Sequence, residues 1–216
     1  NTLFSAELKA ELQRRGLVAV LVVDDAADAV PLARALLAGG VSIMELTLRT
    51  PAALDALQAI REHVPEMIAG IGTILTPDQA AAARRAGAAF GVAPGMNPRV
   101  AARAREVGLP FAPGIATPSD IEAALEFGCR LLKFFPAETA GGIRHLKALA
   151  APYAHLDLRY MPLGGLTLDN IAAYLALPCV AAVGGSWLAP RPAIRSRDWA
   201  AITRNAAQAT AAIAAA

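Results

Sequence analysis

Short apolar runs, each followed by a stretch with helical spacing, are the feature that most constrains how this chain of 216 residues can fold. The runs are almost continuous in Val, Ile, Leu, Ala and Gly, which is typical of strands buried on both faces of a parallel sheet. Seven strands are predicted at residues 16–23, 41–50, 67–73, 88–95, 109–115, 158–165 and 179–185, and an eighth is predicted around Lys133. A parallel sheet is therefore the expected core.

Start and stop signals for helices fill the intervals between these strands. The first helix is predicted at residues 2–15, where Gly16 ends it, and the last begins near Asp198. Between them, helices are expected to begin at Asp24-Asp25, Pro51, Thr76-Pro77, Pro98 and Thr117-Pro118, and to end at Gly39-Gly40, Gly87, Gly108 and Gly128. The chain thus alternates strand and helix, with short connections.

Eight sequential strand–helix units have two main solutions, an open doubly wound sheet or a closed barrel. The open sheet lacks its usual G-x-G-x-x-G fingerprint after the first strand. Eight units in 216 residues instead favour the barrel at its compact limit. No linker, charge block or low-complexity insert divides the chain. We therefore predict an α/β fold, a (β/α)8 TIM barrel with an N-terminal helix, as a single domain over residues 1–216.

The composition argues against several classes of partner. A net charge of +2 without a basic run leaves no electrostatic footprint for nucleic acid. Every apolar stretch is broken well short of the roughly 18 residues of a membrane span. Cys129 and Cys179 lack metal-ligand or secretory spacing, so they are interpreted as reduced thiols of a cytoplasmic protein. The first residues have acidic side chains and helical spacing rather than the layout of a signal peptide.

Histidine placement gives no sign of a metal site. His63, His145 and His155 are predicted on solvated helices or loops, away from the strand ends. No cluster of His, Asp and Glu has the spacing of metal ligands. We therefore expect no metal.

Lys133 is the most unusual residue of the predicted strands, because it stands in the otherwise apolar run 131–135, which ends at Pro136. Burying a charged lysine costs several kcal/mol, so such a lysine usually sheds its proton or finds a partner. A neutral amine is the nucleophile that forms a Schiff base with a carbonyl group. The alternative is a lysine whose ammonium reaches water at a strand end. Alternation places Lys133 and Phe135 on one side of the sheet and Phe134 on the other, against the helices.

Polar residues stand at the expected carboxyl ends of the strands, where the active site of a barrel lies. Glu45, Thr47 and Arg49 are spaced by two, which predicts all three on one side of the sheet. If Glu45 faces the interior, a carboxylate, a guanidinium and an amine meet above an apolar floor. The alternative is an ion pair between Glu45 and Arg49 within the strand, although a charged pair there is costly unless something uses it. Thr73 ends the third strand, but strands favour threonine in any case.

Glycine pairs follow the last two strands. Gly164-Gly165 ends the seventh strand, and Gly184-Gly185-Ser186 ends the eighth. At these positions of a barrel, backbone N–H groups can hold a phosphate, helped by a helix N-terminus. Paired glycines are also common in ordinary turns. Their occurrence after both strands favours an anion site.

These residues together resemble the class I 2-keto-3-deoxy-6-phosphogluconate (KDPG) aldolases, which also act as 4-hydroxy-2-oxoglutarate aldolases. The resemblance covers nearly the whole chain. The motifs that carry it are E-L-T-L-R-T (45–50), G-I-G-T (70–73), A-P-G-M (93–96), P-G-I-A-T (113–117), K-F-F-P-A-E (133–138) and G-G-S-W (184–187). Several ordered motifs at matching spacing are far more specific than any one of them.

The resemblance implies a role for each chemical group. Lys133 would form the Schiff base with pyruvate, and Glu45 would be the general acid/base. Arg49 and Thr73 would hold the pyruvate carboxylate. Pro94 and Phe135 would line the pocket. The phosphate end would be bound by Gly164, Gly165, Gly185 and Ser186. Members of the family are typically homotrimers that need no metal or other cofactor.

Two departures from the family pattern bear on the substrate. Where P-T-G-G is common after strand seven, this chain has P-L-G-G, with Leu163 in the place of the threonine. Ala116 stands where serine is common. Each change removes a hydroxyl group, and Leu163 also adds apolar bulk. The preferred aldehyde is therefore left open.

The expected reaction is reversible cleavage of a KDPG-type 2-keto-3-deoxy-6-phospho sugar acid to pyruvate and glyceraldehyde 3-phosphate. Cleavage of 4-hydroxy-2-oxoglutarate to pyruvate and glyoxylate is a second candidate reaction. Three alternatives stay open at this point. They are a phosphosugar isomerase or epimerase with Glu45 as base, a metal-dependent aldolase, and a non-catalytic protein that binds a keto acid or a phosphate.

Overall fold

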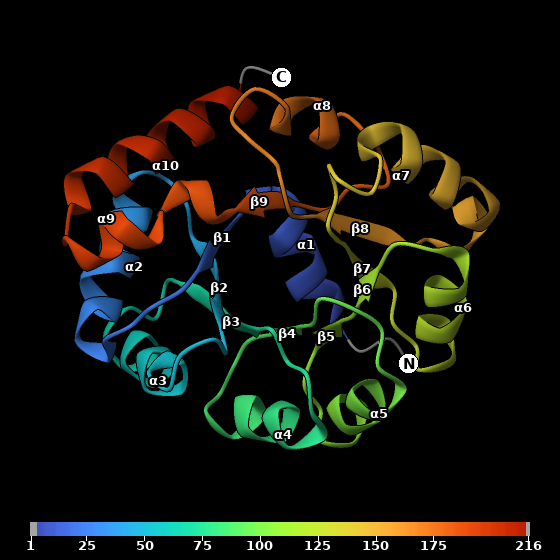
Figure 1. Ribbon diagram of the computed structural model, residues 1–216, viewed down its shortest axis with the longest axis horizontal. Helices are drawn as coiled ribbons and strands as arrows, with labels where there is room; N and C mark the ends of the chain where they lie inside the picture. The colour runs from blue at the N-terminus through green and yellow to red at the C-terminus, as the bar shows by residue number, and fades with distance from the viewer. Residues whose placement is uncertain (1–3, 215–216) are drawn as a thin grey trace.

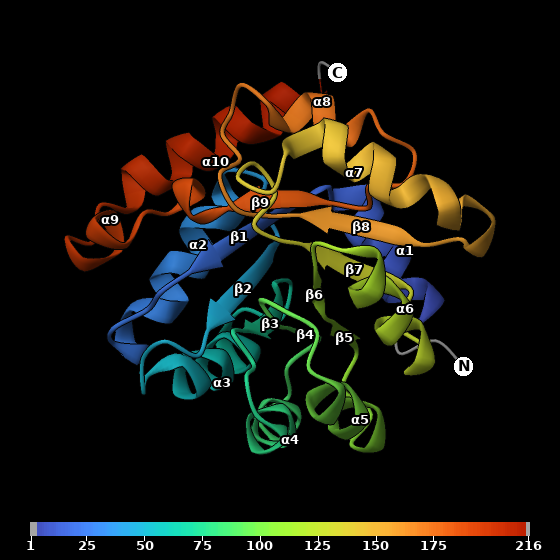
Figure 2. The same ribbon diagram turned by 45° about the vertical axis from the view of Figure 1, so that its right-hand side comes forward.

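The strands of the protein curl around a common centre, and helices surround them (Figures 1 and 2). This arrangement comes from a computed structural model that describes residues 4–214. Every named strand pairs in parallel with its neighbours. The predicted α/β fold with a parallel sheet is confirmed. So is the N-terminal helix, α1 (Ala6–Arg15), although residues 2 and 3 of that prediction lie outside the described residues.

The strands form two hydrogen-bonded sheets. The larger has the order β5-β4-β3-β2-β1-β9 and the smaller the order β6-β7-β8. Isolated parallel bridges between Tyr160 and Val180, and between Leu163 and Gly184, connect the β8 region to the β9 region. The bounds are β1 (Leu17–Leu21), β2 (Ile43–Thr47), β3 (Ile68–Gly72), β4 (Gly91–Val92), β5 (Phe111–Ala112), β6 (Gly114–Ile115), β7 (Leu131–Phe134), β8 (Arg159–Pro162) and β9 (Val183–Gly185). This pairing establishes a curled parallel sheet, and closure into a full ring stays a prediction.

The fifth predicted strand, residues 109–115, is in fact two short strands, β5 and β6, separated by Pro113. Proline has no backbone N–H, so it interrupts a ladder. The neighbouring Gly114 lies against the β4–α5 loop, since a Cβ atom there would be 2.2 Å from the carbonyl oxygen of Pro94. The break therefore accompanies a close backbone contact between two adjacent strand ends.

Apart from α1, the helices lie around the outside of the curled sheet in Figure 1. Thr76 and Thr117 cap their helices in reciprocal capping boxes, as the Thr-Pro pairs predict. The α-helices are α2 (Ala29–Ala38), α3 (Ala53–His63), α4 (Pro77–Arg85), α5 (Pro98–Glu106), α6 (Pro118–Glu126), α7 (Gly142–Ala150), α8 (Ile171–Leu175), α9 (Arg191–Arg195) and α10 (Trp199–Ala214). Three 3₁₀ turns are η1 (Ala26–Asp28), η2 (Ala151–Leu156) and η3 (Ser186–Leu188).

Two predicted helix starts are wrong in detail. The helix after β2 begins at Ala53, because Pro51 and Ala52 form a turn ahead of it. Asp25 caps the 3₁₀ turn η1 by accepting a hydrogen bond from the N–H of Ala27, but Asp24 caps nothing. Its carboxylate instead contacts α9, as described below.

Alternation along the strands divides the buried side chains into two clusters. Leu21, Leu46 and Phe134 pack between the sheet and the helices. Val18 and Ile43 point inward and pack with residues of and near α1, such as Phe4, Leu8 and Leu12. Figures 1 and 2 place α1 behind the strands. The amino-terminal end of the sheet is thereby filled by α1, and the carboxyl ends of the strands are left for a site.

His145 differs from the prediction that the histidines are solvated. It is half-buried on α7, where its Nε2 lies 2.9 Å from the carbonyl oxygen of Ala116. The centroid of its ring also lies 5.8 Å from that of Phe134, and the two ring planes are tilted by 34°. His63 and His155 are exposed.

Two further observations concern membrane-spanning helices and the two cysteines. In residues 4–214, none of the helices has both the length and the hydropathy that crossing a membrane would require. Cys129 and Cys179 are both free thiols, the first buried and the second half-buried.

Candidate active site

Lys133 on β7 and Glu45 on β2 meet inside the curled sheet. The Nζ atom of Lys133 lies 3.0 Å from Oε1 and 3.2 Å from Oε2 of Glu45. Lys133 is 5% exposed and Glu45 is fully buried. The ring centroid of Phe135 is 5.2 Å from the same nitrogen. An amine and a carboxylate in this contact can exchange a proton, and both are almost entirely buried.

Two glycines on β3 leave space for buried side chains, one of them for Glu45. A side chain at Gly72 would overlap the carboxylate of Glu45, and one at Gly70 would overlap the ring of Phe90. The register sets Gly70 beside Glu45 across the β2–β3 ladder. The G-I-G-T motif therefore has a steric function, which the sequence reasoning did not assign.

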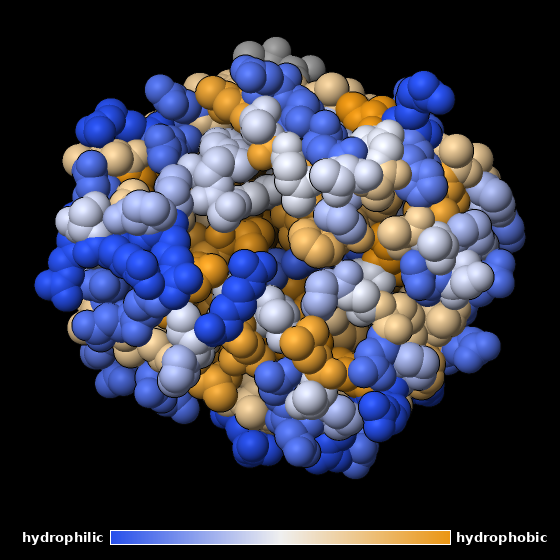
Figure 3. Space-filling model, in the orientation of Figure 1, coloured by the Kyte–Doolittle hydropathy of each residue, from blue (hydrophilic) through white to orange (hydrophobic). Residues whose placement is uncertain are grey.

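A cavity of about 300 Å³ opens above this pair at the carboxyl ends of the strands. Figure 3 shows a hollow at the centre of the corresponding face, bordered by both hydrophobic and hydrophilic residues. The predicted site residues that line it are Arg49, Thr73, Pro94, Lys133, Phe135, Gly164, Gly165, Gly185 and Ser186. Glu45 is the exception, because it lies beneath the cavity surface in contact with Lys133.

Arg49 reaches the cavity by a different route from the one predicted. Strand β2 ends at Thr47, so Arg49 stands in the following turn and strand alternation does not orient it. Its side chain is exposed and makes no ion pair within residues 4–214, so the alternative of an intrastrand pair with Glu45 is not realised. The guanidinium is thus available to an anion in the cavity.

Thr73 has an unusual backbone conformation. Its φ is 58°, in the left-handed region that non-glycine residues rarely adopt. Such a conformation costs about 1–3 kcal/mol and is often found at ligand sites. Thr73 directly follows β3 and is part of the cavity wall.

The glycine-rich end of the cavity is formed by two loops. Gly164 and Gly165 have φ values of 96° and 82°, which favour glycine. Gly185 and Ser186, at the junction of β9 and η3, line the same cavity. Leu163 lines the same end and is 2% exposed, so an apolar side chain stands where the family pattern has a hydroxyl group. Ala116 lies outside this lining.

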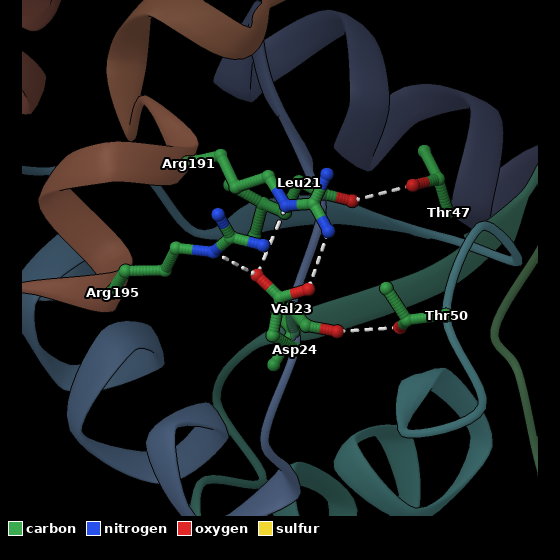
Figure 4. A network of polar contacts seen from close by, with 7 residues as sticks. All are labelled: Leu21, Val23, Asp24, Thr47, Thr50, Arg191 and Arg195. Atoms are coloured by element: carbon green, nitrogen blue, oxygen red, sulfur yellow. Dashed lines mark hydrogen bonds and ion pairs between the residues drawn. The ribbon is translucent and has the colours of Figure 1, made fainter.

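Polar contacts hold the β1 end against its neighbours (Figure 4). The hydroxyl groups of Thr47 and Thr50 donate to the carbonyl oxygens of Leu21 and Val23, at 2.8 and 2.5 Å. Asp24 accepts from Arg191 at 2.5 Å and from Arg195 at 2.7 Å. These guanidinium groups hold the pKa of the Asp24 carboxyl well below its usual range. The β1 end is thereby tied to β2, to the turn that follows β2, and to α9, the helix that follows η3.

Comparison with known proteins agrees with this geometry. The profile of the aldolase family described as KDPG and KHG aldolase matches residues 8–205. The chain belongs to this family. It is 47% identical to a 2-dehydro-3-deoxy-phosphogluconate aldolase of Treponema pallidum over 192 residues, 89% of this chain and 90% of the relative. It is 44% identical to the KHG/KDPG aldolase of Escherichia coli K12, over 89% of both chains.

A solved structure of the KDPG aldolase of Legionella pneumophila superimposes with a TM-score of 0.87 at 38% identity. The match covers 92% of this chain and 96% of that one. That crystal structure holds pyruvate captured at low pH as a covalent carbinolamine intermediate.

Further residues of this KDPG and KHG aldolase family member support the cavity without having been predicted. The hydroxyl group of Tyr174 on α8 donates to the carboxylate of Glu138, which directly follows the K-F-F-P-A run. Backbone N–H groups of Ala137 and Glu138 donate to the carbonyl oxygens of Leu163 and Gly164, at 2.8 and 3.1 Å. Burial, reinforced by the bond to Glu138, raises the pKa of Tyr174, so its hydroxyl stays a donor. Only tertiary contacts between α8 and the β7 loop reveal this support.

The described residues also show whether side chains are grouped in the way that a metal site requires. Among residues 4–214, no three His, Cys, Asp or Glu side chains are grouped so as to hold a metal ion. The ionisable groups that line the cavity or lie directly beneath it are the amine of Lys133, the guanidinium of Arg49 and the carboxylate of Glu45.

Proposed function

We propose that this protein is a Schiff-base (class I) aldolase that cleaves a KDPG-type 2-keto-3-deoxy-6-phospho sugar acid to pyruvate and glyceraldehyde 3-phosphate. The observation that carries the proposal is the buried contact between Lys133 and Glu45 at the base of a cavity that Arg49 borders. The names of the relatives support the substrate class, and the carbinolamine of the Legionella enzyme supports the covalent step.

The first half of the reaction builds an electron sink. Glu45 accepts a proton from Lys133, and the free amine attacks the 2-keto carbon to form a carbinolamine. Glu45 returns a proton to the carbinolamine hydroxyl, water leaves, and a protonated imine remains. The 3.0 Å contact between the two residues lets one carboxylate serve both transfers.

The second half breaks the carbon–carbon bond. The C4 hydroxyl gives its proton to Glu45, directly or through one water, while the electrons of the C3–C4 bond move into the imine. The aldehyde leaves and an enamine remains. Protonation at C3 and hydrolysis of the imine then release pyruvate and restore Lys133.

The other residues bind and orient the substrate. Arg49 donates two parallel hydrogen bonds to the keto-acid carboxylate, and the Thr73 hydroxyl donates another to it. Pro94 and Phe135 form apolar walls beside the reacting carbon atoms. The phosphate end is held by backbone N–H groups of the two glycine-rich loops and by the serine hydroxyl: Gly164, Gly165, Gly185 and Ser186.

Leu163 favours cleavage of 4-hydroxy-2-oxoglutarate as a second activity. Its buried apolar side chain takes up space at the phosphate end and offers no hydrogen bond. A substrate without a phosphate makes no contact at that end, so having Leu163 in place of the threonine does not weaken its binding. Comparing cleavage of KDPG, its C4 epimer and 4-hydroxy-2-oxoglutarate decides the preference.

Trapping with borohydride tests the covalent step. Incubation with pyruvate and borohydride should add a fixed mass to one peptide, the one that contains Lys133. An isomerase or epimerase that uses Lys133 only electrostatically would show no adduct. A metal-dependent aldolase would lose activity with EDTA, and a pure binding protein would retain ligand without turnover.

Two variants complete the test. Lys133→Met should abolish turnover and adduct formation, whereas Glu45→Gln should still form the imine, but slowly. Normal aldolase activity in Lys133→Met would refute the proposal.

The proposal also covers the closure of the barrel, the oligomeric state and the cellular location of the enzyme. We propose one domain in which the two sheets close into a (β/α)8 barrel, supported by the bridges between the β8 and β9 regions and by the continuity of β5 and β6 across Pro113. The family resemblance supports a cytoplasmic homotrimer that works without a cofactor. Light scattering on the purified protein measures the oligomeric state.

A further inference from the structure

The turn η3 carries two of the residues that line the glycine-rich end of the catalytic cavity. Ser186 is exposed there, Trp187 is half-buried, and Gly185 directly precedes them. The indole ring of Trp187 lies against Gly185, because a Cβ atom placed on that glycine would be 2.8 Å from Cδ1 of the ring. The positions of Trp187 and Gly185 are therefore coupled by direct contact.

The segments on either side of η3 are both anchored to the β1 region. Strand β9, which precedes the turn, pairs in parallel with β1. Helix α9, which follows the turn, is held by Asp24, shortly after β1, because Arg191 and Arg195 donate to that carboxylate. A third contact reaches the backbone of the turn itself, and it comes from α10.

The side-chain amide of Asn205 on α10 makes this third contact. Its Nδ2 donates to the carbonyl oxygens of Trp187 and Leu188, both at 3.4 Å. Two carbonyl acceptors require the NH₂ end of the amide, which carries two donors. A peptide group is planar and trans, so holding these carbonyl groups fixes the orientation of the peptide planes 187–188 and 188–189.

Asn205 is not the residue that the helix alone would favour. It stands on the face of α10 that packs against the protein, among the buried Ile202, Ala206 and Ala209. Asparagine has a lower helix propensity than alanine or leucine, and it places a polar amide at a half-buried position. The two hydrogen bonds to η3 account for an asparagine here.

We infer that Asn205 is a positioning residue for the phosphate end of the substrate. Helix α10 lies outside β9 (Figure 1), and Asn205 is not among the residues that line the cavity. It acts through the turn, by keeping Trp187 in place and with it the backbone of Gly185 and the hydroxyl of Ser186. The inference rests on the proposed function, which assigns the phosphate to these two residues.

Steady-state cleavage of two substrates tests the inference. Asn205→Leu removes both donors and keeps the number of side-chain heavy atoms. We expect the KM for KDPG to rise about fivefold, the effect of about one net hydrogen bond, with kcat unchanged. The KM for 4-hydroxy-2-oxoglutarate, which has no phosphate, should stay the same. An equal rise for both substrates would indicate a merely structural role and would overturn the inference.

Thr203→Val is the matched control on the same helix. The hydroxyl of Thr203 donates to the carbonyl oxygen of Ala35 on α2 at 3.0 Å, away from η3. This variant should lower the melting temperature and leave both KM values unchanged. It therefore separates the loss of a hydrogen bond made by α10 from the loss of the contact with the turn.

Binding of glycerol 3-phosphate, measured by calorimetry, probes the phosphate end without the reaction, since this compound has no carbonyl group for Lys133 to attack. The wild type and Thr203→Val should bind it saturably and equally, and Asn205→Leu about fivefold more weakly. No saturable binding by the wild type, or equal binding by Asn205→Leu, would overturn the inference. Failure of the proposed aldolase reaction shows separately, as the absence of a trapped pyruvate adduct on Lys133.

Discussion

A Cβ atom placed on Gly72 would lie 1.8 Å from Oε1 of Glu45. The two residues therefore share one volume inside the curled sheet, and the carboxylate can contact Lys133 only because β3 has no side chain at that position. The first prediction concerns this space.

Gly72→Ala should lower kcat about 100-fold, because displacing a catalytic group by about 1 Å has an effect of that size. Steady-state cleavage of KDPG measures it. Gly95→Ala is the control, since a Cβ atom there has nothing within 4 Å. An unchanged kcat in correctly folded Gly72→Ala would show that Glu45 is not required at its observed place.

Breaking the buried pair should destabilise the protein. Lys133→Met leaves the carboxylate of Glu45 buried without its partner, and we expect the free energy of unfolding to fall by about 3 kcal/mol. Adding Glu45→Gln removes the isolated charge, so the double variant should be more stable than the sum of the single effects predicts. Urea denaturation at neutral pH measures all four proteins, and strictly additive changes would argue against coupling.

Leu163→Thr should shift the preference toward phosphorylated substrates. The introduced hydroxyl adds one hydrogen-bond donor at the glycine-rich end, which we expect to raise kcat/KM for KDPG relative to 4-hydroxy-2-oxoglutarate about tenfold. Leu163→Val, which shortens the side chain without adding a hydroxyl, separates the loss of bulk from the new hydrogen bond. Equal shifts in both variants would assign the effect to bulk alone.

Tyr174→Phe should weaken the phosphate end specifically. The lost hydroxyl releases Glu138, whose backbone N–H holds the carbonyl oxygen of Gly164. We expect KM for KDPG to rise several-fold while the rate of pyruvate trapping on Lys133 is unchanged. A parallel loss of both activities would instead indicate general damage to the fold.

Acid should remove the contribution of Asp24 to stability. Its folded-state pKa lies below the unfolded value of about 3.9, because Arg191 and Arg195 donate hydrogen bonds to its carboxylate. The stabilisation is therefore present above pH of about 4 and is lost as the pH falls through the folded-state pKa. Melting temperatures from pH 7 to 2 should show that Asp24→Asn is less stable at neutral pH and that the difference shrinks in acid. A constant difference over that range would contradict this assignment.

Much of the fold could be predicted because local signals agree with it. Thr-Pro pairs start α4 and α6, and continuous apolar runs mark buried parallel strands. The break at Pro113 could not be placed in advance, because a proline can also begin or end a strand. Asp24 has the residue type of a helix cap, but two arginines more than 160 residues away take its carboxylate. Long-range partners of this kind leave no local pattern.

The sequence by itself determined the order of strands and helices, the apolar surroundings of Lys133 and the family motifs, because periodicity and residue type depend on near neighbours. Only the tertiary structure decided that Glu45 lies beneath the cavity in contact with Lys133, that Gly72 provides its space, and that Arg49 enters from a turn. These relations join strands that are far apart in the chain. They follow from how the sheet curls and packs, which no single segment encodes.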